Sequence, residues 1–525
     1  MEINVPPASP RELVLVAKPD AKLRVVGDKV ISIGGAADVT PLMDLVSAGR
    51  VAVWPLYGVS EEWLKQRTAL LDVETGSERP LDLSLFYKVT APDNTLEDIA
   101  ALLRNMRFVQ SAYVKPGVEL PIIDNSLEFA HGIAPGAVTG DFTPLQVYLN
   151  AASDGGVGAR CAWDKPGGGG DGVNIIDIEG AWNFGHEDLG KNQDGLVGGV
   201  EIVDSGWRNH GTAVLGVIGG DRNTLGVTGI CPEAKVRTVS IFGNPGGGPV
   251  KNWGPSAAIF HAADMLGKGD IILIEHHLPG PPTFKKNNAQ VGYIPVEWWP
   301  CNMAAIQYAT AKGIFVVEAA GNGRRNLDLP TYDKNPDPPH GPFPPEWSNP
   351  FKKGSIDTKA IFVGAGAPPE GISNSQIPDR SRMEFSNFGS RLDVQGWGDQ
   401  VVTSGYGGFP ITIPNEKQWY TRRFWGTSSA AAMVAGVVGA LQGFLRAGGI
   451  SLSPGELREL LRDDSLNSPQ AQGPSGSPVE KFHIGPRPDL CKLIAHLSQP
   501  DGLARESNAS IRTKVGRLLR RLIGA

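Results

Sequence analysis

Gly-Thr-Ser-Ser-Ala-Ala-Ala-Met-Val-Ala-Gly, residues 426–436, is the stretch that decides the fold of this 525-residue chain. It places Ser428 at the beginning of an apolar helix, because residues 430–445 contain a single polar side chain, Gln442. The run is shorter than the roughly 18 apolar residues that indicate a membrane span, so we expect a buried core helix. The N-terminus of a helix favours a nearby oxyanion. Ser428 is therefore either a simple helix cap or a nucleophile.

A nucleophilic serine needs a base and a group that orients the base. The segment 209–220 places His210 immediately before a second helix of small apolar residues. Asp177 ends the β-branched run in residues 172–180, which is typical of a buried parallel strand whose carboxylate emerges at the carboxyl edge. Alone, His210 would be a structural histidine and Asp177 a cap or turn residue. Together with Ser428 they give the chain order Asp, His, Ser.

These segments resemble the subtilisin-like serine peptidases, in which the same chain order occurs. The resemblance covers residues 141–498 and implies an α/β fold with a doubly wound, mostly parallel sheet flanked by helices. It rests on six motifs in family order, which are Ile175-Ile-Asp followed by His186-Glu-Asp-Leu189, His210-Gly-Thr, Gly226-Val-Thr-Gly-Ile-Cys-Pro232, Ala319-Ala-Gly-Asn322, Phe385-Ser-Asn-Phe-Gly389 and Gly426-Thr-Ser428.

The resemblance implies a serine endopeptidase that hydrolyses peptide bonds through an acyl-enzyme on Ser428. His210 would be the general base and acid, and Asp177 would orient its ring. Asn322 and the N–H of Ser428 would form the oxyanion hole. No cofactor is required for this chemistry. The residues expected to bind the peptide or protein substrate are His277, Leu278, Ala319, Ala320 and Gly321.

Two other functions stay open at this point. The same acyl-enzyme would serve a peptide ligase or macrocyclase, and a retained fold without catalysis would serve a binding protein. The complete catalytic set argues against the second of these. Two departures leave the substrate preference open: residues 429–433 read Ser-Ala-Ala-Ala-Met where relatives carry Met-Ala-Thr-Pro-His, and His277-Leu-Pro279 replaces a Ser-Leu-Gly edge.

Two glutamates, Glu275 and Glu318, interrupt apolar strands that should be neighbours. An unpaired buried carboxylate is costly, so we expect them either to face one another and share a proton or to pair separately with basic groups or water. A structural calcium site is a further expectation. Its candidate ligands are Asp188 and Asn223, whose oxygens suit calcium.

Residues 1–140 precede the resemblance and have an α+β pattern of their own, with strands expected over 81–89 and 108–114 and a helix from Thr95 to Met106. This part resembles, more weakly, a subtilase propeptide, which implies a zymogen inhibited by its own N-terminal domain and processed between residues 121 and 140. A permanent accessory domain is the alternative. Proline-rich insertions at 279–300 and 330–350 are expected either to shape the rim of the cleft or to be solvated, purely structural insertions.

Residues 499–525 form a basic tail in which an amphipathic helix is expected over 511–525, suited to an acidic membrane surface, a partner or the protein itself. The net charge of −6 argues against nucleic acid as a partner. The N-terminal residues lack the pattern of a classical signal peptide, which leaves a cytoplasmic location or export by another route. The four cysteines neither require nor exclude an oxidising compartment.

Overall fold

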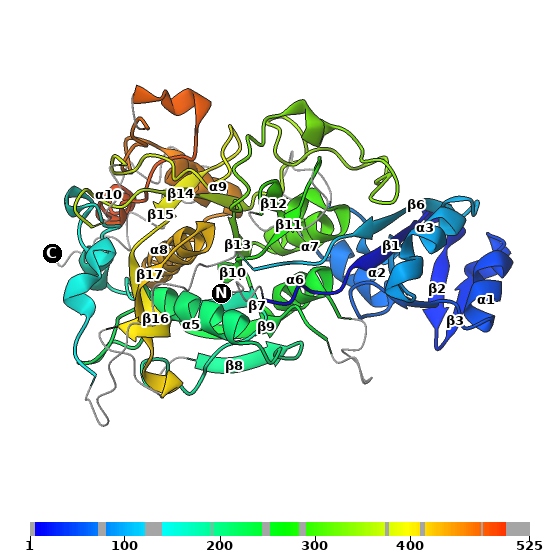
Figure 1. Ribbon diagram of the computed structural model, residues 1–525, viewed down its shortest axis with the longest axis horizontal. Coiled ribbons are helices and arrows are strands. Elements are labelled where there is room, and N and C mark those ends of the chain that lie inside the picture. The colour runs from blue at the N-terminus through cyan, green and yellow to red at the C-terminus, as the bar shows by residue number, and fades with distance from the viewer. Residues whose placement is uncertain are drawn as a thin grey trace.

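The computed structural model describes residues 6–71, 80–120, 139–190, 193–243, 253–282, 290–372, 377–409, 415–473 and 476–499. The predicted processing segment therefore lies mostly outside the described residues, and the predicted tail helix lies wholly outside them. The described parts are arranged around two separate main sheets (Figure 1).

A seven-stranded sheet forms the centre of the molecule, and all its pairs are parallel. Its strands carry runs of Val and Ile that are buried on both faces, as expected of a parallel sheet covered by helices. In spatial order the strands are β15 (Val394–Trp397), β14 (Ile361–Gly366), β13 (Phe315–Ala319), β10 (Ile271–Ile274), β7 (Asn174–Glu179), β9 (Lys235–Ser240) and β8 (Gln193–Gly198).

Helices cover both faces of this sheet (Figure 1), which confirms the predicted doubly wound α/β class. Helices α5 (Ser205–Gly219) and α8 (Thr427–Ala447) pack on one face, and α6 (Pro255–Met265) and α7 (Pro300–Ala311) pack on the other. The remaining helices and strands of this part are α4 (Ala159–Trp163), α9 (Pro454–Arg462), α10 (Leu490–Leu497) and two hairpins, β11 (His277–Pro279) with β12 (Tyr293–Pro295) and β16 (Val401–Phe409) with β17 (Tyr420–Phe424).

Helix α8 is the central helix expected from the sequence. At 21 residues it is long and apolar enough to cross a membrane, but 94% of its apolar window is buried inside the protein. Its glycines allow close packing: a Cβ at Gly443 would clash with the carbonyl of Gly167, and a Cβ at Gly439 would lie 2.7 Å from the sulfur of Cys231. The small residues therefore serve contact with the protein core.

The N-terminal residues form an antiparallel sheet in the order β4-β5-β1-β6. Strand β5 is shorter than expected, because a helical turn at residues 83–85 precedes it. The elements of this part are β1 (Glu12–Ala17), β4 (Ala52–Pro55), β5 (Phe86–Thr90), β6 (Val109–Lys115), the hairpin β2 (Leu23–Val26) with β3 (Lys29–Ser32), and the helices α1 (Thr40–Ser47), α2 (Glu61–Ala69) and α3 (Leu96–Arg104). The predicted boundary at residue 140 stays a prediction.

The N-terminal sheet docks on α6 and α7 through a continuous apolar cluster. The edge strand β6 is covered by the second proline-rich insertion: the N–H of Val114 donates to the carbonyl of Pro339 at 2.8 Å, and the ring of Tyr113 packs edge-on against Phe343 at 5.1 Å between centroids. Residues 330–350 therefore hold the edge of the N-terminal sheet. This role differs from the expected cleft rim.

Candidate active site

His210 is held inside helix α5. The helix begins at Ser205, because the side chain of Asp204 accepts a hydrogen bond from the N–H of Trp207 and so caps its N-terminus. The expectation that His210 stands immediately before a helix is therefore wrong, since it is the sixth helical residue. Its side chain is completely buried at the carboxyl end of β7. Burial inside a helix fixes the ring more firmly than a loop would.

The acid beside His210 is Glu179 and not Asp177. The Nδ1 atom of His210 lies 2.7 Å from Oε1 of Glu179, although the pair is not aligned as a hydrogen bond. Asp177 instead accepts a hydrogen bond of 2.8 Å from the indole of Trp182. Side chains on a strand alternate, so residues 177 and 179 share a face and Glu179 is nearer the carboxyl end. The predicted orienting role of Asp177 is thus corrected.

Ser428 is the second residue of α8, and it is completely buried at the carboxyl ends of the central strands. Its hydroxyl lies 3.5 Å from the carbonyl oxygen of Glu275, directly after β10. Nε2 of His210 is buried and has no hydrogen-bond partner among the described residues. Catalytic hydrogen bonds often form only when substrate is bound, so an unpartnered Nε2 of His210 does not conflict with a role as base.

The side chain of Asn322 is held in place by Thr427. Its side-chain oxygen accepts two hydrogen bonds of 2.9 Å, one from the N–H and one from the hydroxyl of Thr427. The nitrogen Nδ2 therefore points away from Thr427, and it is buried without a partner among the described residues. A buried amide donor without an acceptor is costly unless something else accepts its hydrogen bond. Gly426, with φ of 103°, leads the chain past this amide into α8.

The predicted substrate edge is in contact with the N-terminal part of the chain. Glu119 forms an isolated antiparallel bridge with His277, and its N–H lies 3.5 Å from the His277 carbonyl oxygen. Gln290 donates to the carbonyl of Leu120 at 2.7 Å. Leu278 pairs with Ile294 of β12. An extended segment thus lies along the edge where a peptide substrate was expected.

The other predicted substrate residues, Ala319, Ala320 and Gly321, lie at the carboxyl end of β13 beside Asn322. The carbonyls of Ala320 and Gly321 already accept hydrogen bonds from the side chain and the backbone of Asn387. Gly321 also donates its N–H to Thr427 at 3.1 Å. These residues are therefore placed as a wall of the site, with little free capacity to accept hydrogen bonds from a substrate.

Three carboxyl groups meet on the α5 and α8 face of the sheet. Leu273 pairs with Asp177 and Ile274 with Ile178, so the next step of the ladder brings Glu275 beside Glu179. Burial raises the pKa of Glu275 well above its ordinary value, and the charges of Glu179 and Asp177 raise it further. Burial and the charge of Glu179 also raise the pKa of Asp177 well above its ordinary value.

Glu275 and Glu318 do not face one another, so the predicted shared proton between them is wrong. The partner of Glu318 across the ladder is Ile274, whose side chain points to the opposite face from Glu275. The carboxyl of Glu318 instead accepts the N–H of Glu297 at 3.2 Å. Burial, and then the charge of Glu297, raise the pKa of Glu318 well above its ordinary value.

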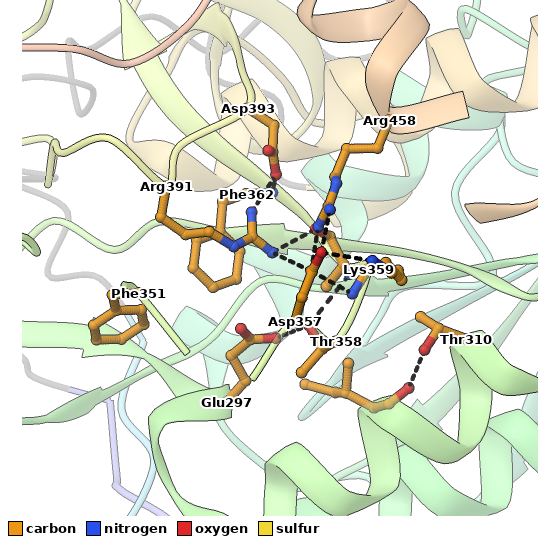
Figure 2. A network of polar contacts seen from close by, with 12 residues as sticks. Glu297, Thr310, Phe351, Asp357, Thr358, Lys359, Phe362, Arg391, Asp393 and Arg458 are labelled. Atoms are coloured by element: carbon orange, nitrogen blue, oxygen red, sulfur yellow. Dashed lines mark hydrogen bonds and ion pairs between the residues drawn. The ribbon is translucent and has the colours of Figure 1, made fainter. Parts of the chain in front are cut away.

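Glu297 belongs to a polar network on the α6 and α7 side of the sheet (Figure 2). Glu297 accepts a hydrogen bond of 2.6 Å from the hydroxyl of Thr358. Asp357, the residue before Thr358, forms a two-bond ion pair with Arg458 at 2.6 and 2.7 Å. Burial raises the pKa of Glu297 to about 7, while the charge of Arg391 opposes the rise. This network is structural and is separated from the catalytic face by the sheet.

The calcium candidates contact one another through an amide donor. Nδ2 of Asn223 donates to one oxygen of Asp188 at 2.8 Å, and the N–H of Val227 donates to the other. The side-chain oxygen of Asn223 accepts from the N–H of Leu225. Burial raises the pKa of Asp188 to about 7. Both oxygens of Asp188 accept hydrogen bonds from N–H donors, and Asn223 turns its nitrogen rather than its oxygen towards Asp188, so this arrangement does not fit a calcium site.

With this geometry in place, comparison with known proteins identifies the family. The model of the Subtilase family matches residues 192–477, which is more than half of the chain. The chain belongs to the subtilase family. Subtilases are serine endopeptidases that act on peptides or proteins and need no cofactor for catalysis. Because the family match begins after Glu179, it does not itself assign the acid of this subtilase.

The curated relatives of this subtilase are distant. It is 23% identical over 281 residues to the major intracellular serine protease of Bacillus subtilis, covering 52% of this chain and 69% of that protein. It is 26% identical over 344 residues to mycosin-3 of Mycobacterium tuberculosis, covering 61% and 67%. Among solved structures, the prenylagaramide maturation protease PagA is 18% identical with a TM-score of 0.42, covering 65% of this chain and 98% of that one.

Proposed function

We propose that this subtilase hydrolyses peptide bonds through an acyl-enzyme on Ser428, with a Glu179-His210-Ser428 triad. His210 takes the proton of the Ser428 hydroxyl through Nε2 as the oxygen attacks the peptide carbonyl, and it returns that proton to the leaving amine. Water then attacks the acyl-enzyme, with His210 again as the base. The observation that carries the proposal is the buried 2.7 Å contact between His210 and Glu179.

Three groups stabilise the charges that develop during the reaction. Glu179 holds the imidazole ring and stabilises its protonated form. The free Nδ2 of Asn322 and the N–H of Ser428 at the beginning of α8 are available to the oxygen of the tetrahedral intermediate. The two hydrogen bonds from Thr427 preorganise Asn322, so little reorganisation is needed during the reaction.

Labelling with a small fluorophosphonate tests the nucleophile, and Ser429 supplies a matched control. Ser429 is the next residue and is equally buried, but its hydroxyl is used by the carbonyls of Trp397 and Gly426 at 2.8 and 3.0 Å. We expect the wild-type chain and Ser429→Ala to be labelled and Ser428→Ala to stay unlabelled. Labelling that survives in Ser428→Ala would exclude Ser428 as the nucleophile.

We further propose that the N-terminal part inhibits the enzyme through the segment that contains Glu119 and Leu120. Its support is the bridge between Glu119 and His277 together with the bond from Gln290 to Leu120. Replacing Glu119 with proline removes the N–H that approaches His277, whereas Glu119→Ala keeps it. In the full chain, Glu119→Pro should cleave a small peptide ester faster than Glu119→Ala does. Equal rates for the two variants would contradict inhibition by this contact.

A further inference from the structure

Glu275 is a buried carboxyl group at the nucleophile that the triad does not use. It directly follows β10, and its backbone carbonyl oxygen lies 3.5 Å from the hydroxyl oxygen of Ser428. Neither of its carboxyl oxygens has an aligned hydrogen-bond partner among the described residues, and both are fully buried. The proximity of the Ser428 hydroxyl acts to lower the pKa of this carboxyl, against the effect of burial.

The side chains around Glu275 include more carboxyl groups than basic groups. Asp177 and Glu179 of β7 act on it directly as like charges. His210 of α5 contacts Glu179, and the charge of His210 contributes to lowering the pKa of His277 of β11. The beginning of α8 contributes the uncharged Ser428, and β13 presents apolar side chains on this face.

No lysine or arginine of the described residues forms an ion pair with Asp177 or Glu275, and none contributes to the shifts of their pKa values. Lys115, whose charge lowers the pKa of the nearby His276, is ion-paired with Glu12 of the N-terminal sheet. One negative charge in this cluster is offset when His210 is protonated. A second charge would be buried without compensation.

We propose that Glu275 holds a proton in the active enzyme and that its ionisation sets the upper pH limit of catalysis. A neutral Glu275 leaves Glu179 as the charge that pairs with His210. An ionised Glu275 places a negative charge beside the Ser428 oxygen, where negative charge also develops in the transition state. Glu275 thereby acts as a positioning residue through Glu179 and Ser428. The inference rests on the proposed Ser428 chemistry.

The test is the pH dependence of fluorophosphonate labelling and of kcat/KM in the full chain. In the wild type both should rise as the base deprotonates and then fall by about tenfold per pH unit above the ionisation of Glu275. Glu275→Gln, which keeps the shape but cannot ionise, should lose the alkaline fall and stay within about twofold of its maximum. Glu275→Asp, which retains a carboxyl, should keep the fall at a displaced pH.

Glu318→Gln is the matched control, because Glu318 is an equally buried glutamate of the adjacent strand on the opposite face. Its pH profile should follow the wild type even if its stability differs. Superimposable alkaline limbs in the wild type and Glu275→Gln, or an equal change in Glu318→Gln, would overturn the role of Glu275. Labelling that does not depend on Ser428 at any pH would instead overturn the proposed function itself.

Discussion

At the scale of residues, two carboxyl groups on β7 have different partners because of where the strand ends. Asp177 and Glu179 point to the same face, but Glu179 is the last strand residue and the one that contacts His210. Asp177 accepts a hydrogen bond from the indole of Trp182, and burial raises its pKa well above the ordinary value. The proposed triad therefore assigns orientation of the base to the carboxyl at the edge of the sheet, where it contacts the histidine.

Substitutions separate these two carboxyl groups. Glu179→Gln should lower kcat by about 1,000- to 10,000-fold, because the imidazole loses the anion that fixes its tautomer and stabilises its charge. Asp177→Asn keeps an acceptor for Trp182 and should lower kcat by less than about tenfold. Steady-state kinetics at one pH measure both. A larger loss in Asp177→Asn would restore Asp177 as the acid of the triad.

Two substitutions of different expected effect test the oxyanion role proposed for Asn322. Asn322→Ala should lower kcat by about 100- to 1,000-fold with little change in KM, because the oxyanion donor acts in the transition state. Thr427→Val removes one of the two bonds that orient Asn322 but keeps the backbone N–H, so its loss should be smaller. Separate measurement of kcat and KM for both variants checks this order; equal losses would show that orientation by the hydroxyl dominates.

Much of the site was predictable from single residues, and the part that was not depended on contacts between strands. Ser428, His210 and Asn322 of the proposed site could be predicted because each stands in a local motif. Glu179 was missed although its place directly before Gly180 put it at the carboxyl edge. The opposite faces of Glu275 and Glu318 follow from the register of β10 with β13, which no local pattern encodes.

At the scale of elements, α8 carries the proposed nucleophile at its N-terminus, and its body of small residues packs on the sheet and on the loop before β7. The packing is backbone to backbone at Gly443, whose Cα faces Gly167 and Gly170. The sequence predicted a buried core helix there from its composition. It could not predict which glycines meet another backbone, because that depends on the tertiary path of residues 167–170.

Gly443→Ala should therefore be strongly destabilising, by about 2–4 kcal/mol, because the new methyl group meets a carbonyl that cannot rotate away. Gly455→Ala in α9 is the matched control. A Cβ at Gly455 has no neighbour closer than 3.9 Å, so alanine there should stabilise by up to about 1 kcal/mol through its helix propensity. Chemical denaturation of both variants measures the difference; equal stabilities would contradict close packing at Gly443.

At the scale of the whole molecule, the N-terminal sheet is joined to the catalytic part by buried charge as well as by apolar contact. Lys115 of β6 is completely buried, and it contacts Glu12 at 2.6 Å, Ser256 of α6 at 3.2 Å and Asn302 of α7 at 3.1 Å. Lys88 contacts the other oxygen of Glu12 at 3.0 Å. Removal of one charge would leave the others buried, so this cluster favours one docking geometry.

The docking should consequently weaken in acid. The charges of Lys115 and Lys88 outweigh desolvation and lower the pKa of Glu12 from 4.5 to about 2. Because the folded pKa is the lower one, the stabilisation is fully present above pH 4.5 and is lost as the pH falls towards 2. The shift corresponds to roughly 3 kcal/mol. Thermal unfolding of the full chain should therefore show a steep loss of stability across this pH window.

Glu12→Gln removes the titrating group and isolates its contribution. At pH 7 the variant should be less stable than the wild type, because Lys115 stays buried without its anion. Between pH 4.5 and 2 its stability should fall less than that of the wild type, so the two curves should converge. Hydrogen exchange at the amides of β1 and β6 locates the effect in the N-terminal sheet. Parallel stability curves would show that Glu12 does not couple this docking to pH.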